Sequence, residues 1–128
     1  MRLLLDTCTF LWMISGAREL SKPARTLLAD AENDVYLSAV SDWEIALKHS
    51  LGRLPLPEAP ERFVPAQRQS HRIETLPLDE ESVLSLARLP ALHQDPFDRM
   101  LVCQAIILGM TLLTPDPLIS QYPVRVLW

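Results

Sequence analysis

The most constraining feature of this sequence is the stretch from Asp95 to Gly109, which has the pattern of a capped and mostly buried helix. Asp95 suits the N-cap, because its carboxylate can accept a hydrogen bond from a free first-turn N–H. Pro96 suits the first helical position, and Gly109 is a natural stop. The rest is largely apolar, with Asp98 and Arg99 near the start. Capping and charge–dipole interactions are one explanation for these charges, and a functional site is the other.

Length and composition bound the class of protein. The 128 residues, 48% of them hydrophobic, suffice for one domain with a core, and we expect a single domain over residues 1–128. The net charge of −4 argues against broad nucleic-acid binding through a basic surface. It remains compatible with a site whose carboxylates are neutralised by bound cations.

The cellular environment is constrained by the start of the chain and by its cysteines. The first residues are too few and too soon acidic for a signal peptide, and no apolar run approaches a membrane span. We therefore expect a cytoplasmic protein without membrane association. Cys8 and Cys103 are then expected to be free thiols, without an activating partner for catalysis.

Short apolar segments alternate with helical patterns along the chain. We predict strands at Arg2–Leu5, Val35–Ser38, Arg72–Leu76, Met110–Thr114 and Val124–Trp128. We predict helices at Thr9–Ser15, from Ser21 to Asn33-Asp34, at Ser41–His49, Glu61–Ser70, Asp79–Ala87 and Pro96–Leu108, with an extended connector at Leu54–Pro60 and one turn at Leu118–Gln121. The alternation predicts an α/β fold with helices on both faces of a mainly parallel sheet.

Four acidic residues are expected at one edge of this sheet. Asp6 ends the first strand, and Glu44 lies early in the helix after the second strand. Asp98 begins the helix that leads back into the fourth strand, and Asp116 follows that strand. Ligands of such folds bind beyond the carboxyl ends of the strands, so the four carboxylates are candidates for a site.

Each acid also has a structural explanation. Asp6 and Asp116 could cap the segments that follow them, and the sequence Ser41-Asp42-Trp43-Glu44 fits a capping box. Four independent caps, however, need not lie on one edge. Clustered carboxylates repel one another unless a cation or a proton holds them together. Oxygen ligands suit Mg²⁺ or Mn²⁺, which can activate water and stabilise charge on a phosphodiester.

Other polar and aromatic residues have less specific patterns. Lys48 follows Glu44 by one helical turn, which favours an ion pair over a substrate contact. Arg99 could bind a phosphate or pair with an acid. We expect surface or supporting roles for His49, His71 and His93, and core positions for Trp12, Trp43 and Phe97.

Four short motifs carry a family resemblance, in the right order and over nearly the whole chain. They are Leu4-Leu5-Asp6-Thr7, Ser41-Asp42-Trp43-Glu44-Ile45, Asp95-Pro96-Phe97-Asp98-Arg99-Met100-Leu101 and Leu113-Thr114-Pro115-Asp116. Together they resemble the acidic motifs of PIN-domain ribonucleases, and the chain most resembles the VapC-type toxins of bacterial type II toxin–antitoxin modules.

The resemblance implies a three-layer α/β/α sandwich with a five-stranded sheet. It also implies RNA cleavage that depends on Mg²⁺ or Mn²⁺, a homodimer, and inhibition by a cognate antitoxin. By position, Asp6, Glu44, Asp98 and Asp116 match the catalytic, metal-binding acids, and Asp116 matches the least constant of them. Supporting or substrate-contacting candidates around them are Asp95, Thr7, Thr114, Lys48 and Arg99.

Two other functions share part of the pattern. The strand before Asp6 also resembles the nucleophile strand of haloacid-dehalogenase-like phosphatases, but Cys8 stands where a second acid is usual. A receiver-like signalling module with a regulatory Mg²⁺ would need an acceptor Asp after the third strand and a Lys after a later one. The third strand is followed by Pro77, and the only lysines are Lys22 and Lys48.

Overall fold

The computed structural model describes all residues 1–128 and contains one five-stranded sheet. All four strand pairings are parallel, in the order β3-β2-β1-β4-β5. The strands are β1 (Arg2–Leu5), β2 (Asp34–Ser38), β3 (Glu74–Leu76), β4 (Thr111–Leu113) and β5 (Val126–Leu127). The predicted α/β class and five-stranded sheet are confirmed.

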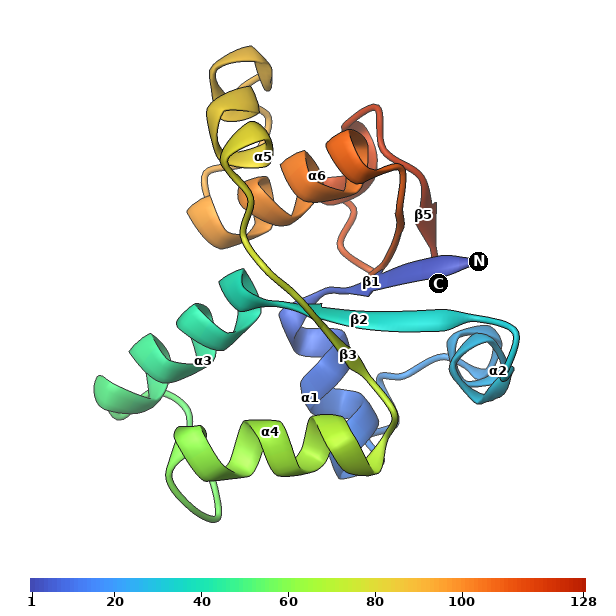
Figure 1. Ribbon diagram of the computed structural model, residues 1–128, viewed down its shortest axis with the longest axis vertical. Helices are drawn as coiled ribbons and strands as arrows, with labels where there is room; N and C mark the ends of the chain where they lie inside the picture. Colours follow the sequence, from blue (N-terminus) through green and yellow to red (C-terminus); the bar gives the residue numbers. More distant parts are fainter.

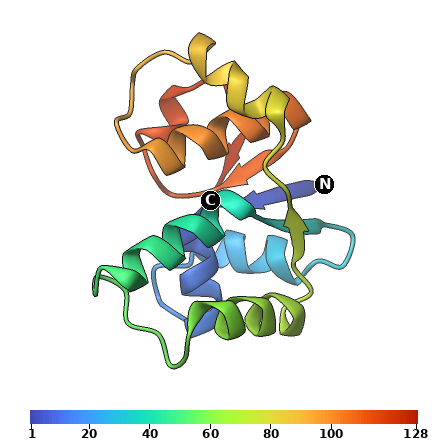
Figure 2. The same cartoon turned by 60° about the vertical axis from the view of Figure 1, so that its left-hand side comes forward.

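Helices cover both faces of the sheet (Figures 1 and 2). One layer contains α1 (Thr7–Ser15), α2 (Lys22–Ala29), the body of α3 (Ala39–Ser50), and α4 (Pro60–Ser70). The other contains α5 (Glu80–Leu84), η1 (Ser85–Arg88), α6 (Pro96–Leu108) and η2 (Ile119–Gln121). No helix combines the length and apolar character needed to cross a membrane.

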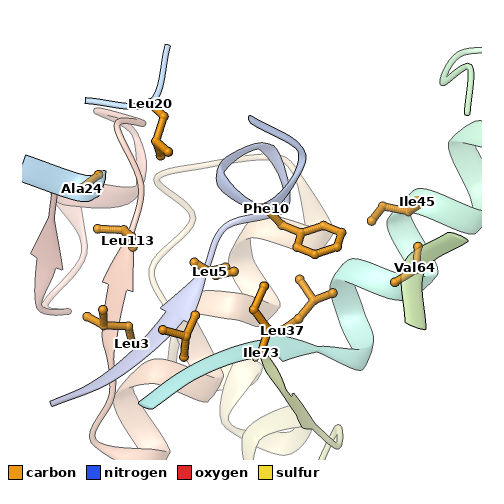
Figure 3. Close-up of a cluster of buried hydrophobic side chains, with 11 residues drawn as sticks. Leu3, Leu5, Phe10, Leu20, Ala24, Leu37, Ile45, Val64, Ile73 and Leu113 are labelled. Atoms are coloured by element: carbon orange, nitrogen blue, oxygen red, sulfur yellow. The ribbon is translucent and has the colours of Figure 1, made fainter. Parts of the chain in front are cut away.

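The alternation of side chains along β1 divides the core between the two layers. Leu3 and Leu5 belong to the cluster that includes Phe10 of α1, and Figure 3 shows this cluster. Leu4 points the other way and belongs to the cluster that includes Leu101 of α6. All three leucines are fully buried, because the period of two places successive side chains on opposite, covered faces.

The start of α3 differs from the sequence prediction. The prediction that Ser41 is the N-cap is wrong, because the helix begins at Ala39 and Ser38 is the N-cap. The Ser38 hydroxyl accepts a hydrogen bond from the Val40 N–H. Ser41 is therefore inside the first turn, fully buried, where its hydroxyl oxygen accepts a hydrogen bond from Thr7.

The predicted core position of Trp43 is also wrong. Its side chain is 59% exposed, and its ring meets Phe97 edge-on with centroids 4.9 Å apart. The adjacent Glu44 is buried, so the buried face of α3 includes Glu44 but not Trp43. Phe97 is buried as predicted, while Trp12 is partly buried against the core.

Several element boundaries also differ from the predicted ones. Residues 72 and 73 precede β3, and β5 has only two paired residues. α2 ends at Ala29, and Asp34 already belongs to β2. The segment predicted as one helix from Asp79 to Ala87 divides into α5 and η1. These changes leave the carboxyl ends of β1, β2 and β4 at one edge, with α1 starting directly after β1.

Candidate active site

A groove of about 690 Å³ lies at the carboxyl ends of the central strands. Its lining combines residues from α1, α3, the start of α6 and the segment after β4. The carboxylates that line it are Asp6, Glu44, Asp95, Asp98 and Asp116. The four acids predicted from strand ends and helix starts are thus brought together, and Asp95 joins them.

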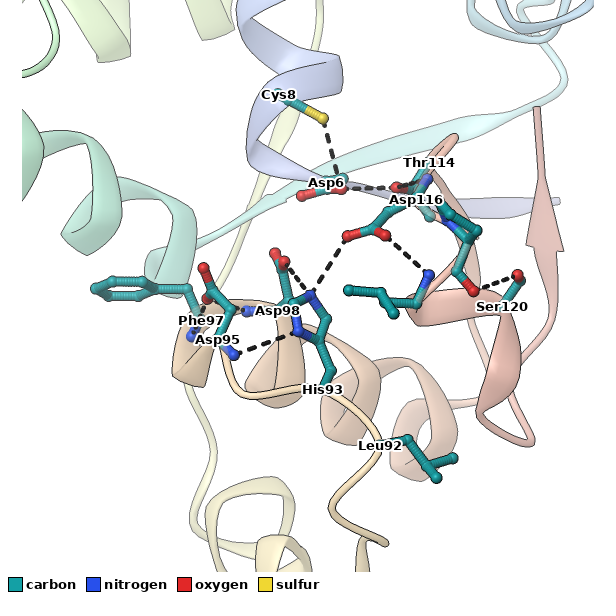
Figure 4. A network of polar contacts seen from close by, with 12 residues as sticks. Asp6, Cys8, Leu92, His93, Asp95, Phe97, Asp98, Thr114, Asp116 and Ser120 are labelled. Atoms are coloured by element: carbon teal, nitrogen blue, oxygen red, sulfur yellow. Dashed lines mark hydrogen bonds and ion pairs between the residues drawn. The ribbon is translucent and has the colours of Figure 1, made fainter.

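Asp6 is held by side chains and does not cap α1. It occupies the N-cap position, but its side chain accepts no capping hydrogen bond. The Thr114 hydroxyl donates to Asp6 Oδ2 at 2.6 Å, and the Cys8 thiol approaches the same oxygen at 3.5 Å (Figure 4). The capping explanation of this buried carboxylate is therefore wrong.

Glu44 reaches the groove from the second turn of α3. Its side chain is 7% exposed and forms the predicted intrahelical ion pair with Lys48, through Oε2. The other oxygen, Oε1, is buried and has no hydrogen-bond partner. A buried, unpaired carboxylate oxygen is costly, and in this groove a bound cation would supply its missing partner.

The two acids at the start of α6 have different surroundings. Asp95 is the predicted N-cap, and its Oδ1 accepts hydrogen bonds from the Phe97 and Asp98 N–H groups at 2.8 and 3.0 Å. Asp98 lies one turn further on, where its side chain is free of capping. Its Oδ2 is 2.9 Å from Nε2 of His93.

His93 connects two of the acids, which is the supporting role of the two that were expected for it (Figure 4). Its Nε2 lies 2.9 Å from Asp98 and 3.4 Å from Asp116. Its Nδ1 faces the Asp95 N–H at 3.3 Å and can accept from it, which places a proton on Nε2, toward the carboxylates. The available signal was its place two residues before the N-cap, which puts it at the same sheet edge.

Asp116 combines a local and a site contact. Its Oδ1 accepts a hydrogen bond from the Leu118 N–H at 2.9 Å, so it orders the turn after β4 as expected. Its Oδ2 faces His93. One atom each from His93, Asp98 and Asp116 lie within 4.8 Å of one another, a spacing that suits a shared cation.

Burial and mutual repulsion alter the acid–base properties of the groove. Burial, together with the charges of Asp6, Asp95 and Glu44, raises the pKa of Asp98 to about 7 against the partial relief from His93. Burial also raises the pKa of Asp6, although the hydrogen bond from Thr114 opposes the shift. Such shifts are expected where carboxylates are gathered without enough positive charge.

The Cys8 thiol and the Lys48 ammonium also line the groove, and both have raised pKa values. Burial and the charge of Asp6 raise the pKa of Cys8 to about 12, so this thiol remains protonated and unreactive. The hydrogen bond to Glu44 raises the pKa of Lys48, so the ammonium remains charged. Cys8 and Cys103 are both free, as predicted.

The remaining predicted site residues are not all in the groove. Thr7 lines it and donates to Ser41 at 2.8 Å, and Thr114 orients Asp6 while accepting from the Asp116 N–H. Arg99 is elsewhere. Its guanidinium donates to the Leu89 carbonyl at 3.3 Å and meets neither an acid nor the groove.

The donor set fits a hard divalent cation. Carboxylate oxygens from separate elements converge, one of them is buried without a partner, and two of the acids have raised pKa values. A divalent cation would supply the missing positive charge, and oxygen donors are those that Mg²⁺ and Mn²⁺ prefer. His93 adds a nitrogen donor at one side of this set.

Comparison with known families identifies the class. The sequence profile of the PIN domain family matches residues 3–124, and the chain therefore belongs to this family. Membership excludes the phosphatase and receiver-like alternatives. Within the family, the chain is 39% identical over 62 residues to Ribonuclease VapC16 of Mycobacterium tuberculosis (strain ATCC 25618 / H37Rv). The match covers 48% of this chain and 43% of that protein, so it spans less than half of the relative's length.

Solved structures share the fold over almost the whole chain. VapBC2 from Rickettsia felis, bound to a DNA fragment from its promoter, gives a TM-score of 0.75 at 16% identity and covers 99% of this chain and 98% of that one. DNA-bound VapBC from Salmonella typhimurium gives 0.70 at 16% identity, with 99% and 97% covered. FitAcB from Neisseria gonorrhoeae gives 0.64 at 22% identity, with 98% and 96% covered. At these identities the likeness shows the fold alone.

Proposed function

We propose that this protein is an endoribonuclease that requires Mg²⁺ or Mn²⁺ and acts as the toxin of a type II toxin–antitoxin module. The observation that carries the proposal is the convergence of Asp6, Glu44, Asp98 and Asp116 on one groove, with a buried Glu44 oxygen left unpaired. Membership of the PIN family and the partial similarity to a VapC ribonuclease support it.

We assign the four acids to two roles. Asp6 and Asp98 bind the metal directly, and Glu44 and Asp116 complete its shell or orient the attacking water. When bound, the metal supplies activation of water and stabilisation of charge on the phosphodiester. Thr114 holds the Asp6 carboxylate in place, and His93 orients Asp98 and Asp116 through Nε2.

The direct test is cleavage of total cellular RNA with added Mg²⁺ or Mn²⁺. We expect activity in the wild type, none with EDTA, and a loss of orders of magnitude in Asp98→Asn. Arg99→Gln is the matched control, since Arg99 is adjacent in sequence but faces away from the groove. Full activity in Asp98→Asn, or no cleavage by wild type under any of these conditions, contradicts the proposal.

We further propose that a cognate antitoxin inhibits the protein through a basic segment. Five carboxylates line the groove, and a guanidinium can pair bidentately with them. Several structural neighbours are VapBC complexes, which fits such a partner. Co-expression with the product of the adjoining gene should give one complex at low salt. Separate elution of the two proteins contradicts this assignment.

We also propose a homodimer, on the strength of an exposed apolar row along α3 and its C-cap residue. Trp43, Leu47 and Leu51 recur every four residues and are 59%, 39% and 56% exposed. An apolar row of this kind is typical of an interface. Light scattering should give twice the 14.5 kDa mass of one chain, and Leu47→Glu should shift the protein toward the monomer.

A further inference from the structure

The groove has a second wall that the acids do not explain. Cys8, Leu11 and Trp12 of α1 line it, at positions that share one helical face. Arg53 and Leu54 line it from the loop that follows α3. A groove lined by apolar and cationic side chains as well as by acids is suited to a ligand with both apolar and anionic parts.

Trp12 is placed as a rigid aromatic surface in this wall. Its ring lies 5.9 Å from that of Trp128 at an interplanar angle of 59°, and it packs against the buried core. The tilt means that the two rings do not cover each other as a parallel stack would. Trp12 is only partly buried, and part of its surface faces the groove.

Arg53 is the unpaired cation of the groove. The groove contains two cationic side chains, and Lys48 is already paired with Glu44. Arg53 is exposed and forms no ion pair or side-chain hydrogen bond, although five carboxylates line the same groove. Its guanidinium is therefore available to an anion, and guanidinium groups match phosphate oxygens.

The backbone at the end of α3 turns Arg53 toward this wall. Gly52 has a φ of +70°, a left-handed conformation that ends the helix. The Gly52 N–H bonds to the His49 carbonyl, and the Arg53 N–H bonds to the Lys48 carbonyl at 2.9 Å. Leu54 packs against the core and anchors the loop. The backbone at Arg53 is thus held by hydrogen bonds to α3 before it and by the packing of Leu54 after it.

We propose that Trp12 and Arg53 form a nucleotide subsite beside the acids, in which Trp12 stacks on one unpaired base and Arg53 pairs with the adjoining phosphate. The inference rests on the proposed RNA cleavage and assigns residues that hold the substrate. Stacking on an aromatic ring requires a base that is free of its helix, so the subsite selects a splayed-out nucleotide. Neither residue touches the reacting phosphodiester, so both act on substrate binding.

Binding can be measured without cleavage in the Asp98→Asn background. The probe is a fluorescein-labelled single-stranded RNA of about ten nucleotides, followed by anisotropy across a salt series. Trp12→Leu should weaken binding about tenfold, and Trp12→Phe, which keeps an aromatic face, should restore most of it. Arg53→Gln should reduce the slope of log K against log salt by about 0.7. Arg53→Lys should keep the slope but bind more weakly, because it loses the bidentate geometry.

Matched controls separate these effects from general ones. Leu84→Ala removes an exposed apolar side chain outside the groove, and Arg18→Gln removes an exposed arginine outside it. Both should bind as the parent does. In the cleavage assay with the natural acids present, Trp12→Leu and Arg53→Gln should raise KM with kcat nearly unchanged. Thermal melts establish that each variant is folded.

Three outcomes overturn the subsite. The first is Trp12→Leu and Arg53→Gln binding RNA as tightly as their controls do. The second is Trp12→Phe binding no better than Trp12→Leu in two folded variants. The third is that Trp12→Leu and Arg53→Gln lose antitoxin binding but still bind RNA normally. This result would show that the wall contacts the protein partner and not RNA. If the wild type cleaves RNA in any of these cases, only the subsite fails; if it cleaves none, the proposed function fails.

Discussion

At the scale of single residues, Asp6 and Asp98 are arranged at the expense of stability. Both are largely buried, neither caps a helix with its side chain, and both have raised pKa values. Asp79, which caps α5, shows the opposite pattern. Burial raises the pKa of Asp79, but hydrogen bonds with Ser82, the backbone and Gln104 together outweigh it and lower the pKa. The contrast separates the acids of the groove from an ordinary capping residue.

Asp6→Asn is expected to leave the free energy of unfolding unchanged or to raise it, in protein freed of metal at neutral pH. The substitution removes a buried charge, while the amide oxygen can still accept the hydrogen bond from Thr114. Urea denaturation measures the change, with Asp34→Asn, an exposed acid on β2, as the control. A loss of more than about 1 kcal/mol would show that Asp6 holds the fold as a cap does.

The pKa of Asp98 predicts a pH dependence of stability. The folded-state pKa of about 7 exceeds the ordinary 3.8, so the folded state binds the extra proton between these values. Stability must then fall as pH rises from about 4 to about 7, and the full cost is present above pH 7.

The measurement is the free energy of unfolding of metal-free wild type and Asp98→Asn across this range. Asp98→Asn should gain stability relative to wild type toward neutral pH. A difference that does not change with pH would contradict the raised pKa. Saturating Mg²⁺ should remove much of the dependence, because it supplies positive charge beside Asp98.

At the scale of elements, α6 combines an anchor and a functional end. Its apolar body is buried against Leu4 and Leu112, and Gly109 ends it with a φ of +65°. Its start places Asp95 and Asp98 one turn apart, where one closes the helix and the other faces the groove. Separate substitutions of Asp95 and Asp98 distinguish the capping role from the role in the groove.

Asp95→Ala should lower the free energy of unfolding by about 1 kcal/mol, because two backbone N–H groups lose their acceptor. Asp95→Asn, which keeps a competent cap, should remain close to wild type in stability and retain substantial RNA cleavage. Thermal melts and the cleavage assay check both variants. If Asp95→Asn abolishes cleavage while Asp98→Asn does not, the metal ligand lies one helical turn earlier than proposed.

At the scale of the whole molecule, the groove joins segments that are distant in the chain. Residues from both ends of the sequence meet there, since Asp6 and Asp116 share the hydrogen-bonding partner Thr114. A cation bound between them would connect β1, α3, α6 and the segment after β4. Binding to the folded chain alone must therefore stabilise the entire molecule.

Mg²⁺ or Mn²⁺ should raise the Tm of antitoxin-free protein. At a concentration ten times Kd the gain is about 1.4 kcal/mol, which corresponds to a few degrees for a domain of this size. Differential scanning calorimetry measures the shift, and Asp98→Asn should show much less of it. No change in Tm at millimolar metal, in protein that melts reversibly, would count against a metal site in the groove.

Much of the fold was predictable because its signals are local. The apolar runs around Leu4 and Leu112, the cap Asp95, and the stop at Gly109 each follow from a few neighbouring residues. The boundaries that differ from the prediction, such as the start of β3 and the break between α5 and η1, depend on strand pairing and side-chain packing. Ser41 was misplaced because Ser38, three residues earlier, offers the same hydroxyl at a better position for capping.

The sequence by itself determined the alternation of strands and helices, and with it the edge on which four acids lie. Only the tertiary structure decided how those acids are held: Thr114 on Asp6, His93 between Asp98 and Asp116, and an unpaired Glu44 oxygen. It also directed Arg99 away and brought Trp12 and Arg53 into the lining of the same groove. The physical reason is that periodicity assigns a residue to a face or an edge. Partners and burial depend on side chains from distant segments, which become neighbours only when the sheet assembles.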